Sequence, residues 1–560
     1  MTEDPIQQEV IHARLLGIVQ EMQNALFRTG FSTIIRESQD ASCALTDPDG
    51  QVIAQHTVLP LHLGAFPACV EGVLHAYPPS EMRPGDAYLV NHPYFGGSPH
   101  ANDVAVIAPV FFQDKLVAFC GSLAHKADIG GSVPGNGSGS ATEIYHEGLQ
   151  VPPVVFARHG RPIRELEIIL RANSRAPDLL LGDIGGQLGC TRLGERRVLG
   201  LLETYGPAAV QASWQRSIRL VEQQVRARIR AWPDGTYTGE AFLDNDGVRV
   251  DRPLRVHVRV KVAGERICFD FRGSDDQATG PSNIRPPLVR AACYYVLKCL
   301  VDPELPSNAG LARVVETEFS PGTLLDPRLP GPVNTYIPTA QAVVEAVLQA
   351  LGPLEPGRRI AGSGGTGALA LGGSRFVQYE LFGSGLGARA GLDGVSGTSV
   401  HVGNSRVTPI EIVESEFPVR VERFELLPDS GGAGQWRGGL GFVREYTLLG
   451  PGRLSTRFDK HVVAAPGADG GLPGRPGATI LNPGAGQEQR LPARVGDVQL
   501  PAGTRLRLER PGGGGFGPPS ARDPAAIQHD IEEGYVTREA AARDYAFDPS
   551  HELLVRRSAQ

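Results

Sequence analysis

Apolar side chains recur at the three- and four-residue spacing of amphipathic helices in several stretches of the chain. The clearest stretch covers residues 7–29 and stops at Gly30, and glycine commonly ends helices. The same spacing predicts helices over 162–175, 191–206, 207–232, 287–301 and 339–352, and a short terminal pair over 523–545. Helices are therefore expected along the whole chain.

Between these helices, short apolar runs bounded by Gly, Pro and Asp predict β-strands. Two alternating runs flank the Asp49-Gly50 turn signal and indicate a hairpin over 42–55. Further strands are predicted over 86–91, 103–112, 115–125, 235–246, 254–262 and 266–273. The pattern favours an α+β protein that is rich in β-strands, with Gly/Pro-rich loops and interspersed helices.

A chain of 560 residues exceeds the roughly 250–300 residues at which one hydrophobic core stops growing, so several packed regions are expected. The sequence shows no repeat of fixed period. We predict an N-terminal region over 1–205, an α+β middle region over 206–330, a Gly-rich β-containing region over 331–519, and terminal helices over 520–560.

The 70 Gly and 45 Pro are the unusual part of the composition, and they cluster in runs such as "GGSVPGNGSGS" and "RPGGGGFGPP". Because 41% of the residues are hydrophobic, the chain has enough apolar material to fold. We therefore interpret the glycines as turns and close backbone approaches, not as disorder.

The net charge of -7, without a basic stripe, argues against nucleic acid as a partner. Seven cysteines lie mostly in apolar runs without a CxxC spacing, which is typical of reduced thiols in the cytosol. The N-terminus has no secretory pattern, and no apolar run approaches the roughly 18 residues that cross a bilayer. A soluble, cytoplasmic protein without membrane contact is expected.

Histidines concentrate in one part of the chain, since seven of the fourteen fall between residues 56 and 146. His100 and Asp103 enter one predicted strand and His125 ends the next, so all three can meet at one strand end. Imidazole and carboxylate suit a divalent transition metal such as Zn²⁺, Mn²⁺ or Fe²⁺. A lone loop histidine is more often a solvated or capping group, but the cluster favours a metal site, with His92 as a fourth candidate ligand.

Two acidic residues near this cluster are candidates for catalysis. Asp128 follows His125 by three residues and is suited to orient a ligand or act as a general base. A turn aspartate before Gly130 explains the same residue almost equally well. Glu143 lies beyond a Gly-rich loop over 130–139 and is a candidate polar contact to substrate, although a solvated acidic turn is the alternative.

Neither a P-loop nor a GxSxG nucleophile elbow occurs in the sequence. The run "AGSGGTGALALGG" lacks the lysine and the strand–loop–helix setting that phosphate binding by a P-loop requires. If nucleotide chemistry is involved, this chain is therefore not expected to bind the nucleotide by a P-loop.

Several long segments resemble the hydantoinase B family, which includes B subunits of ATP-dependent hydantoinases, the C-terminal half of 5-oxoprolinases and alpha subunits of acetone carboxylases. They include "RESQDASCALTDPDGQVIAQ", "GDAYLVNHPYFGGSPHANDVAVIAPVF", "AHKADIGGSVPG" and "TPIEIVESEFPVRVERFELLPDSGGAGQWRGGLGFVREY". The resemblance implies a hetero-oligomer with a hydantoinase A-type ATPase subunit, which uses ATP to activate a small cyclic amide. It also places the histidine–aspartate pair of the family on His100 and Asp103, and its later histidine on His125.

The chain departs from the common family pattern at two positions, where His92 replaces an aspartate and Lys126 replaces a histidine. The resemblance favours a catalytic subunit that hydrolyses the C–N bond of a hydantoin or 5-oxoproline type ring with a metal-activated water. Two alternatives stay open, namely the alpha subunit of an ATP-dependent acetone or ketone carboxylase, and an assembly subunit without catalytic function.

Overall fold

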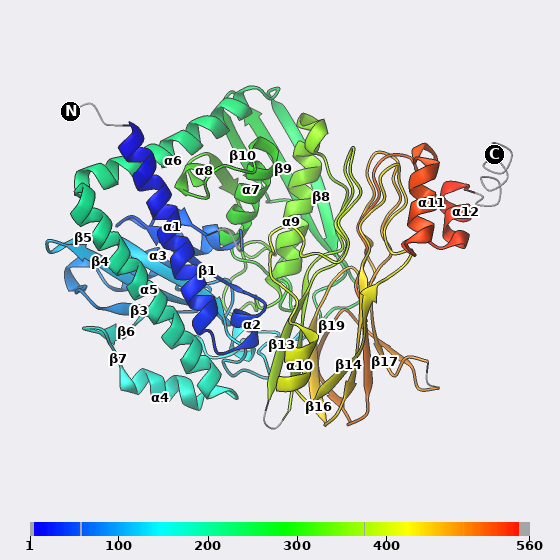
Figure 1. Ribbon diagram of the computed structural model, residues 1–560, viewed down its shortest axis with the longest axis horizontal. Coiled ribbons are helices and arrows are strands. Elements are labelled where there is room, and N and C mark those ends of the chain that lie inside the picture. The colour runs from blue at the N-terminus through cyan, green and yellow to red at the C-terminus, as the bar shows by residue number, and fades with distance from the viewer. Residues whose placement is uncertain (1–4, 57–58, 374–375, 485, 548–560) are drawn as a thin grey trace.

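The computed structural model describes residues 5–56, 59–373, 376–484 and 486–547. Its helices and four β-sheets follow one another along the chain, with the N-terminal elements at one end of the molecule and the C-terminal helices at the other (Figure 1). The expected α+β class is confirmed, with sheets throughout the chain and helices on their faces. The division of the chain into four regions stays a prediction.

The first sheet has seven antiparallel strands in the order β2-β1-β5-β4-β3-β6-β7. Its strands are β1 (Ala41–Thr46), β2 (Val52–Gln55), β3 (Ala87–Val90), β4 (Asp103–Phe112), β5 (Lys115–His125), β6 (Val154–Arg158) and β7 (Arg161–Pro162). The long central pair β4 and β5 confirms the two strands predicted beside the histidines.

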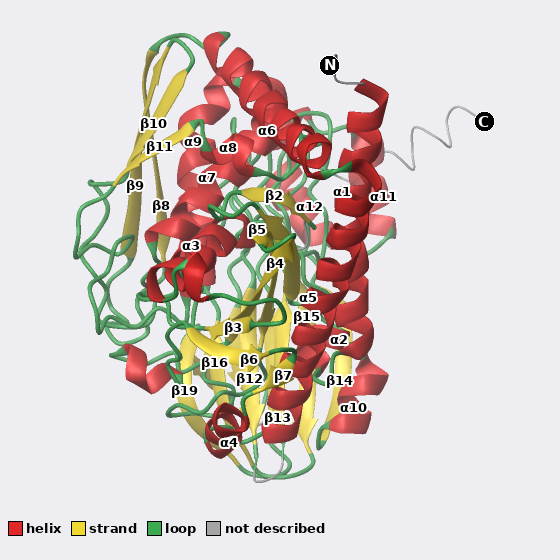
Figure 2. Ribbon diagram, turned by 90° about the vertical axis from the view of Figure 1, so that its left-hand side faces the viewer, coloured by secondary structure: helices red, strands yellow, loops and turns green. Residues whose placement is uncertain are grey.

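Long helices cover both faces of this sheet. On one face α1 (Pro5–Thr29) packs beside α5 (Pro177–Tyr205), and Figure 2 shows the two running side by side. The other face contacts α3 (His62–Ala76), which the apolar pattern does not reveal because Pro67 and two glycines interrupt it. The remaining helices of this half are α2 (Thr33–Arg36), α4 (Arg164–Ala172) and α6 (Pro207–Arg230).

The second sheet combines β8 (Gly235–Leu243), β9 (Leu254–Ala263), β10 (Arg266–Asp270) and β11 (Val315–Glu318), with β10 and β11 parallel. Helices α7 (Pro286–Val301) and α9 (Tyr336–Leu351) pack against each other, and α9 lies on β8 and β9. Their apolar faces form one continuous core with α3 and the first sheet. The short α8 (Ala309–Ala312) contacts α6.

The C-terminal half contains two further sheets whose inner faces share a core. One has the order β13-β12-β16-β19 and the other β14-β15-β20-β17-β18. Their strands are β12 (Gly367–Gly372), β13 (Val377–Phe382), β14 (Val419–Leu426), β15 (Phe442–Leu448), β16 (Gly452–Arg457), β17 (Ala478–Leu481), β18 (Gln489–Leu491), β19 (Arg494–Leu500) and β20 (Arg505–Glu509). Helices α10 (Ile410–Glu416), α11 (Pro524–Glu532) and α12 (Arg538–Tyr545) complete this half.

Between these sheets and α11, extended glycine-rich segments from distant parts of the sequence run side by side, and we call this array the glycine bundle (segments 383–397, 431–441, 465–474 and 511–517) (Figure 1). Backbone hydrogen bonds join the segments, for example from the amide of Gly513 to the carbonyl of Gly439 at 2.9 Å. A methyl group on Gly513 would overlap the carbonyl oxygen of Leu386. Glycine is therefore required by close packing of backbones.

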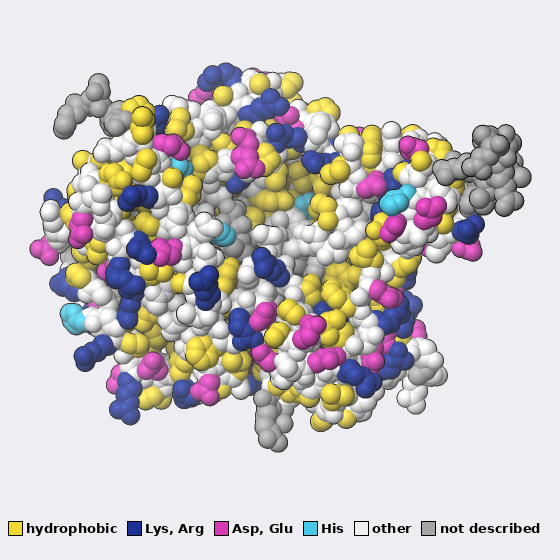
Figure 3. All heavy atoms as spheres, in the orientation of Figure 1, with side chains coloured by type: hydrophobic (Ala, Val, Ile, Leu, Met, Phe, Trp, Pro, Cys, Tyr) yellow, Lys and Arg dark blue, Asp and Glu magenta, His cyan; other side chains and the backbone are white. Residues whose placement is uncertain are grey.

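Charged side chains of both signs are interspersed over the face drawn in Figure 3. All seven cysteines are free thiols, and five of them are buried, as the sequence predicts. No helix in the part of the chain that the structure describes is long and apolar enough to span a membrane.

Candidate metal centre

The strand pairing explains how His100, Asp103 and His125 meet. Asp103 begins β4 and His125 ends β5, and the antiparallel register places these two residues directly opposite each other. His100 lies one turn earlier, and its carbonyl accepts a hydrogen bond from the amide of Asp103 at 3.0 Å. The sequence prediction that these three residues converge at one strand end is confirmed.

The three side chains form a compact, buried cluster. His100 Nε2 lies 3.1 Å from Asp103 Oδ2, and His125 Nδ1 lies 3.3 Å from Asp103 Oδ1. One ligand atom from each residue falls within 4.8 Å of the other two, and all three side chains are at most 4% exposed. Interaction with both histidines holds the pKa of the Asp103 carboxyl well below its usual range despite its burial.

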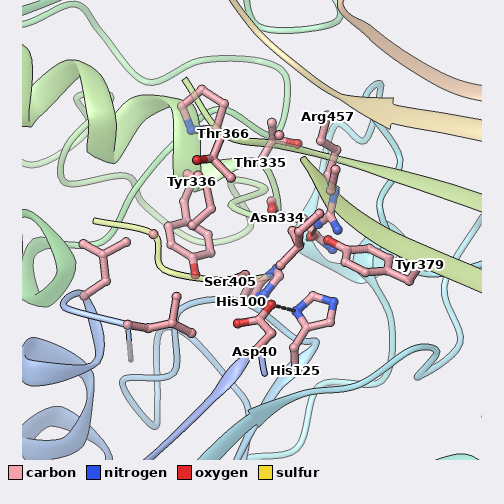
Figure 4. Close-up of a pocket in the computed structure, with 18 of the residues that line it drawn as sticks. Asp40, His100, His125, Asn334, Thr335, Tyr336, Thr366, Tyr379, Ser405 and Arg457 are labelled. Atoms are coloured by element: carbon pink, nitrogen blue, oxygen red, sulfur yellow. Dashed lines mark hydrogen bonds and ion pairs between the residues drawn. The ribbon is translucent and has the colours of Figure 1, made fainter. Parts of the chain in front are cut away.

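A further carboxylate, missed by the sequence analysis, comes from Asp40, just before β1. Its Oδ2 atom lies 3.7 Å from His125 Nδ1, and Figure 4 shows it pointing toward both histidines. Burial and the nearby charge of Asp103 raise the pKa of the Asp40 carboxyl well above its usual value. The pairing of β1 with β5 places Asp40 here, and that pairing leaves no motif in the sequence.

The donor atoms fit a divalent transition metal in two respects. Asn334 Oδ1 lies 2.8 Å from His100 Nδ1, and an Nδ1–H that donates to this oxygen would leave Nε2 available to a metal ion. Burial lowers the pKa of His125 to about 3, which keeps this imidazole in the neutral form that binds metals. Nitrogen and carboxylate donors of this kind suit Zn²⁺, Mn²⁺ or Fe²⁺.

A pocket opens beside the cluster, and its walls come from distant parts of the chain (Figure 4). The Tyr336 hydroxyl lies 3.3 Å from Asp103 Oδ2, and the Tyr379 ring lies over His125 with centroids 4.4 Å apart. Other walls are formed by Leu59, Leu61, His62, Asn334, Thr335, Ile337, Pro338, Thr366, Leu381, Ser405 and Arg457. Both polar and apolar groups therefore face the space beside the cluster.

The structure does not bring His92 into the cluster, so its expected role as fourth ligand has no geometric support. His92 Nδ1 accepts hydrogen bonds from the amides of Tyr94 at 3.1 Å and Phe95 at 3.4 Å. Its ring lies 4.3 Å from that of Phe95. His92 therefore stabilises the turn that follows β3, and the further carboxylate oxygen near His125 comes from Asp40.

Asp128 and Glu143, the two candidate catalytic residues, are also placed outside the pocket. The Asp128 carboxylate accepts hydrogen bonds from the amides of Gly130, Gly135 and Arg175 and pairs with the Arg175 guanidinium at 3.0 Å. It holds the glycine-rich loop, as the turn interpretation expects. Glu143 is 43% exposed and pairs only with the exposed His146 among the described residues, at 3.3 Å.

Glu147 has a structural role that the sequence analysis did not assign. Its buried carboxyl accepts hydrogen bonds from the amides of Val333 at 3.1 Å and Asn334 at 2.7 Å. Burial raises the pKa of Glu147 to about 8. This side chain therefore fixes the segment that carries Asn334, and through it the orientation of His100.

Lys126, the second departure from the common family pattern, is buried next to the cluster without lining the pocket. Its Nζ has no hydrogen-bond partner among the described residues. Burial lowers the pKa of Lys126 to about 8, against the attraction of Asp183 and Asp103.

Comparison with known proteins identifies the family of the chain. The family model for hydantoinase B/oxoprolinase matches residues 4–519. The chain belongs to this family. A putative B subunit of a D-/L-hydantoinase from Pseudomonas sp. (strain NS671) is 34% identical over 97% of this chain and 95% of its own length. Within the hydantoinase B family, the beta subunit of caprolactamase from Pseudomonas jessenii is 31% identical over 97% of this chain and 96% of its own length.

The fold of the chain is also similar to a solved structure. The crystal structure of ATP-dependent caprolactamase from Pseudomonas jessenii superimposes with a TM-score of 0.90, 28% sequence identity and coverage of 98% of both chains. The match to the hydantoinase B/oxoprolinase family confirms the resemblance inferred from the sequence segments.

Proposed function

We propose that the chain is the catalytic B-type subunit of an ATP-dependent cyclic amide hydrolase. The observation that carries the proposal is the buried convergence of His100, Asp103 and His125, with Asp40 beside them, at the wall of a pocket. Relatives named as hydantoinase and caprolactamase subunits support a lactam or hydantoin ring as substrate.

The residues of the chain would hold a Zn²⁺, Mn²⁺ or Fe²⁺ ion through His100, Asp103 and His125, with a further oxygen from Asp40. Such an ion supplies Lewis-acid chemistry and lowers the pKa of a water molecule. Asn334 fixes the tautomer of His100, and Tyr336 lies within hydrogen-bonding distance of Asp103 Oδ2. These contacts hold the ligand atoms in place before substrate arrives.

The amide bond of a lactam is a weak electrophile, and we propose that a hydantoinase A-type ATPase subunit activates it. Two observations support a division of work between two chains, namely the lack of a P-loop motif in this sequence and the naming of its relatives as B or beta subunits. The partner would phosphorylate the amide oxygen, and the pocket of this chain would admit the activated ring.

The test is to purify the chain together with a hydantoinase A-type subunit, measure bound metal, and follow ATP-dependent ring opening of caprolactam, hydantoin and 5-oxoproline. We expect stoichiometric metal and turnover of at least one ring. His100→Ala should lose both, because it removes one of the three clustered ligands. Retention of metal and turnover by this variant would refute the site, while turnover of acetone with bicarbonate instead would indicate a carboxylase. Full turnover by the partner alone would indicate an assembly subunit.

A further inference from the structure

Two buried hydrogen-bond donors in the pocket wall have no partner among the described residues. They are Arg457 Nη2 and the Thr335 hydroxyl, on side chains from residues that are 5% and 1% exposed. Both residues line the same pocket as His100 and His125, and Figure 4 shows them on the side of Asn334 that lies away from Asp40. Burial of unpaired donors destabilises a folded chain, so a ligand that pairs with them is expected.

Arg457 is held rigidly at the end of β16. Its Nη1 donates to the backbone carbonyl of Asn334 at 3.2 Å and also contacts the side-chain oxygen of that residue. The guanidinium carbon lies 4.9 Å from the centroid of the Tyr379 ring, which gives a cation–π contact. These contacts fix the plane of the guanidinium, and therefore the direction in which Nη2 donates.

Charge balance points to an anion as the missing partner. Among the described residues, the buried Arg444 and Arg494 each pair with a carboxylate, whereas Arg457 and the buried Arg510 make no ion pair within 4.0 Å. Of these last two, Arg457 lines the pocket beside the cluster. A buried guanidinium without a nearby counter-ion is costly. Three carboxyl groups act on Arg457, and two of them are engaged, since Asp103 contacts the two histidines and Glu147 accepts two backbone amides. The third, Asp40, lies beside His125.

We infer that Arg457 and Thr335 form an oxyanion-binding subsite beside the metal ligands, which recognises a phosphoryl or carboxylate group on the substrate. A planar guanidinium and a hydroxyl are suited to such oxygens. The inference rests on the proposed function for its biological meaning, because an amide activated by ATP reaches this pocket as a phosphorylated ring. Arg457 would then position the anionic group while the reacting carbon faces His100 and His125.

The direct test measures anion binding to the full chain after metal has been removed with a chelator. Isothermal titration with inorganic phosphate and with acetate should detect binding of at least one anion. Arg457→Met should weaken that binding at least tenfold, and Arg457→Lys, which keeps the charge but not the planar fork, should weaken it less. Thr335→Val should weaken binding, and Thr335→Ser should leave it close to wild type.

Arg453→Met is the matched control, because Arg453 lies on the same strand but is partly exposed and pairs with Asp497. Tighter binding of phosphate than of acetate assigns the subsite to a phosphoryl group, and the reverse assigns it to a carboxylate. Equal anion binding by wild type and Arg457→Met would overturn the inference, as would no binding of either anion to the wild type. If Arg457→Met fails to fold by circular dichroism, Arg457→Lys and Thr335→Val decide the question.

A second readout separates this inference from the proposed function. In the complex with the ATPase subunit, Arg457→Lys should raise KM for the cyclic amide severalfold while bound metal stays stoichiometric. Anion binding requires neither ATP nor turnover. If the wild-type complex shows no turnover but the chain binds anions through Arg457, the proposed function is refuted and the subsite is retained. If turnover is full but anion binding does not depend on Arg457, the subsite alone is refuted.

Discussion

Lys126 offers a sharp test of the electrostatics around the metal centre. Its ammonium is fully buried, lacks a hydrogen-bond partner among the described residues, and has a pKa lowered from 10.5 to about 8. Each tenfold change in proton affinity corresponds to about 1.4 kcal/mol, so the charged form is destabilised in the folded chain by about 3 kcal/mol. The pKa of about 8 already includes the attraction between Lys126 and Asp183, so this attraction is not added again.

The sign of the pH dependence follows from proton binding. Between pH 8 and 10.5 the unfolded chain keeps the Lys126 proton that the folded chain has lost, so stability from this group rises with pH across that window. Below pH 8 the full penalty applies, and above about pH 10.5 it disappears. Lys126→Met, which keeps an unbranched side chain, should therefore stabilise the protein by about 3 kcal/mol at pH 7 and have little effect near pH 10.5.

Thermal unfolding measures this difference. If all 560 residues unfold as one unit, an unfolding entropy of about 2.1 cal/mol/K per residue converts 3 kcal/mol into a rise in Tm of roughly 2–3 °C at pH 7. Lys115→Met is the matched control, because Lys115 begins β5, the strand that Lys126 directly follows, and is exposed. A lower Tm for Lys126→Met at pH 7 would refute the reasoning, since it would mean that the ammonium is favourably paired in solution.

Four further predictions concern the metal centre and the glycine bundle. Asn334→Leu should weaken metal binding by about 10- to 100-fold in competition with a chelator, because His100 loses the partner that orients it. Adding metal at about 1,000 times its Kd should stabilise the wild type by about 4 kcal/mol, and His100→Ala should abolish this gain. Gly513→Ala should destabilise by about 1–3 kcal/mol or more in chemical denaturation, because its methyl meets a carbonyl oxygen. The wild type should lose stability as the pH rises from 4.5 to 8, because the folded chain keeps the Glu147 proton that the unfolded chain releases. Glu147→Gln should reduce this loss.

Each of these predictions has an outcome that contradicts it. Unchanged metal affinity in Asn334→Leu would show that His100 needs no support, and equal stabilisation of His100→Ala by metal would place the ion elsewhere. Gly450→Ala is the control for the bundle, because a methyl there meets no atom within 4 Å. Equal losses in the Gly450 and Gly513 variants would refute the packing argument, and parallel pH curves would refute the one for Glu147.

Local sequence patterns were sufficient for most elements and for the centre of the site. The runs at 103–112 and 115–125 predict adjacent strands, and antiparallel pairing of neighbouring strands brings Asp103 opposite His125 without further information. The burial of most cysteines as free thiols was also predicted correctly, because it depends on the apolar runs in which they lie.

The remaining parts of the pocket depend on contacts between distant segments, which no local pattern encodes. Asn334 lies 234 residues from His100 in sequence, and Tyr379 and Arg457 come from the C-terminal sheets. His92 was a plausible ligand by residue type, yet the turn after β3 uses its ring nitrogen for backbone amides. Residue type therefore identifies which side chains are able to bind a metal. Only the tertiary arrangement determines which of them share a site.

The glycine bundle has a thermodynamic consequence for the whole protein. Its interior is backbone packed on backbone, so unfolding this part hydrates peptide groups and very little hydrocarbon. Exposure of polar surface lowers the heat capacity of unfolding, whereas exposure of apolar surface raises it. The glycine bundle should consequently contribute less to the heat capacity of unfolding, residue for residue, than the N-terminal half, whose cores consist of buried apolar side chains.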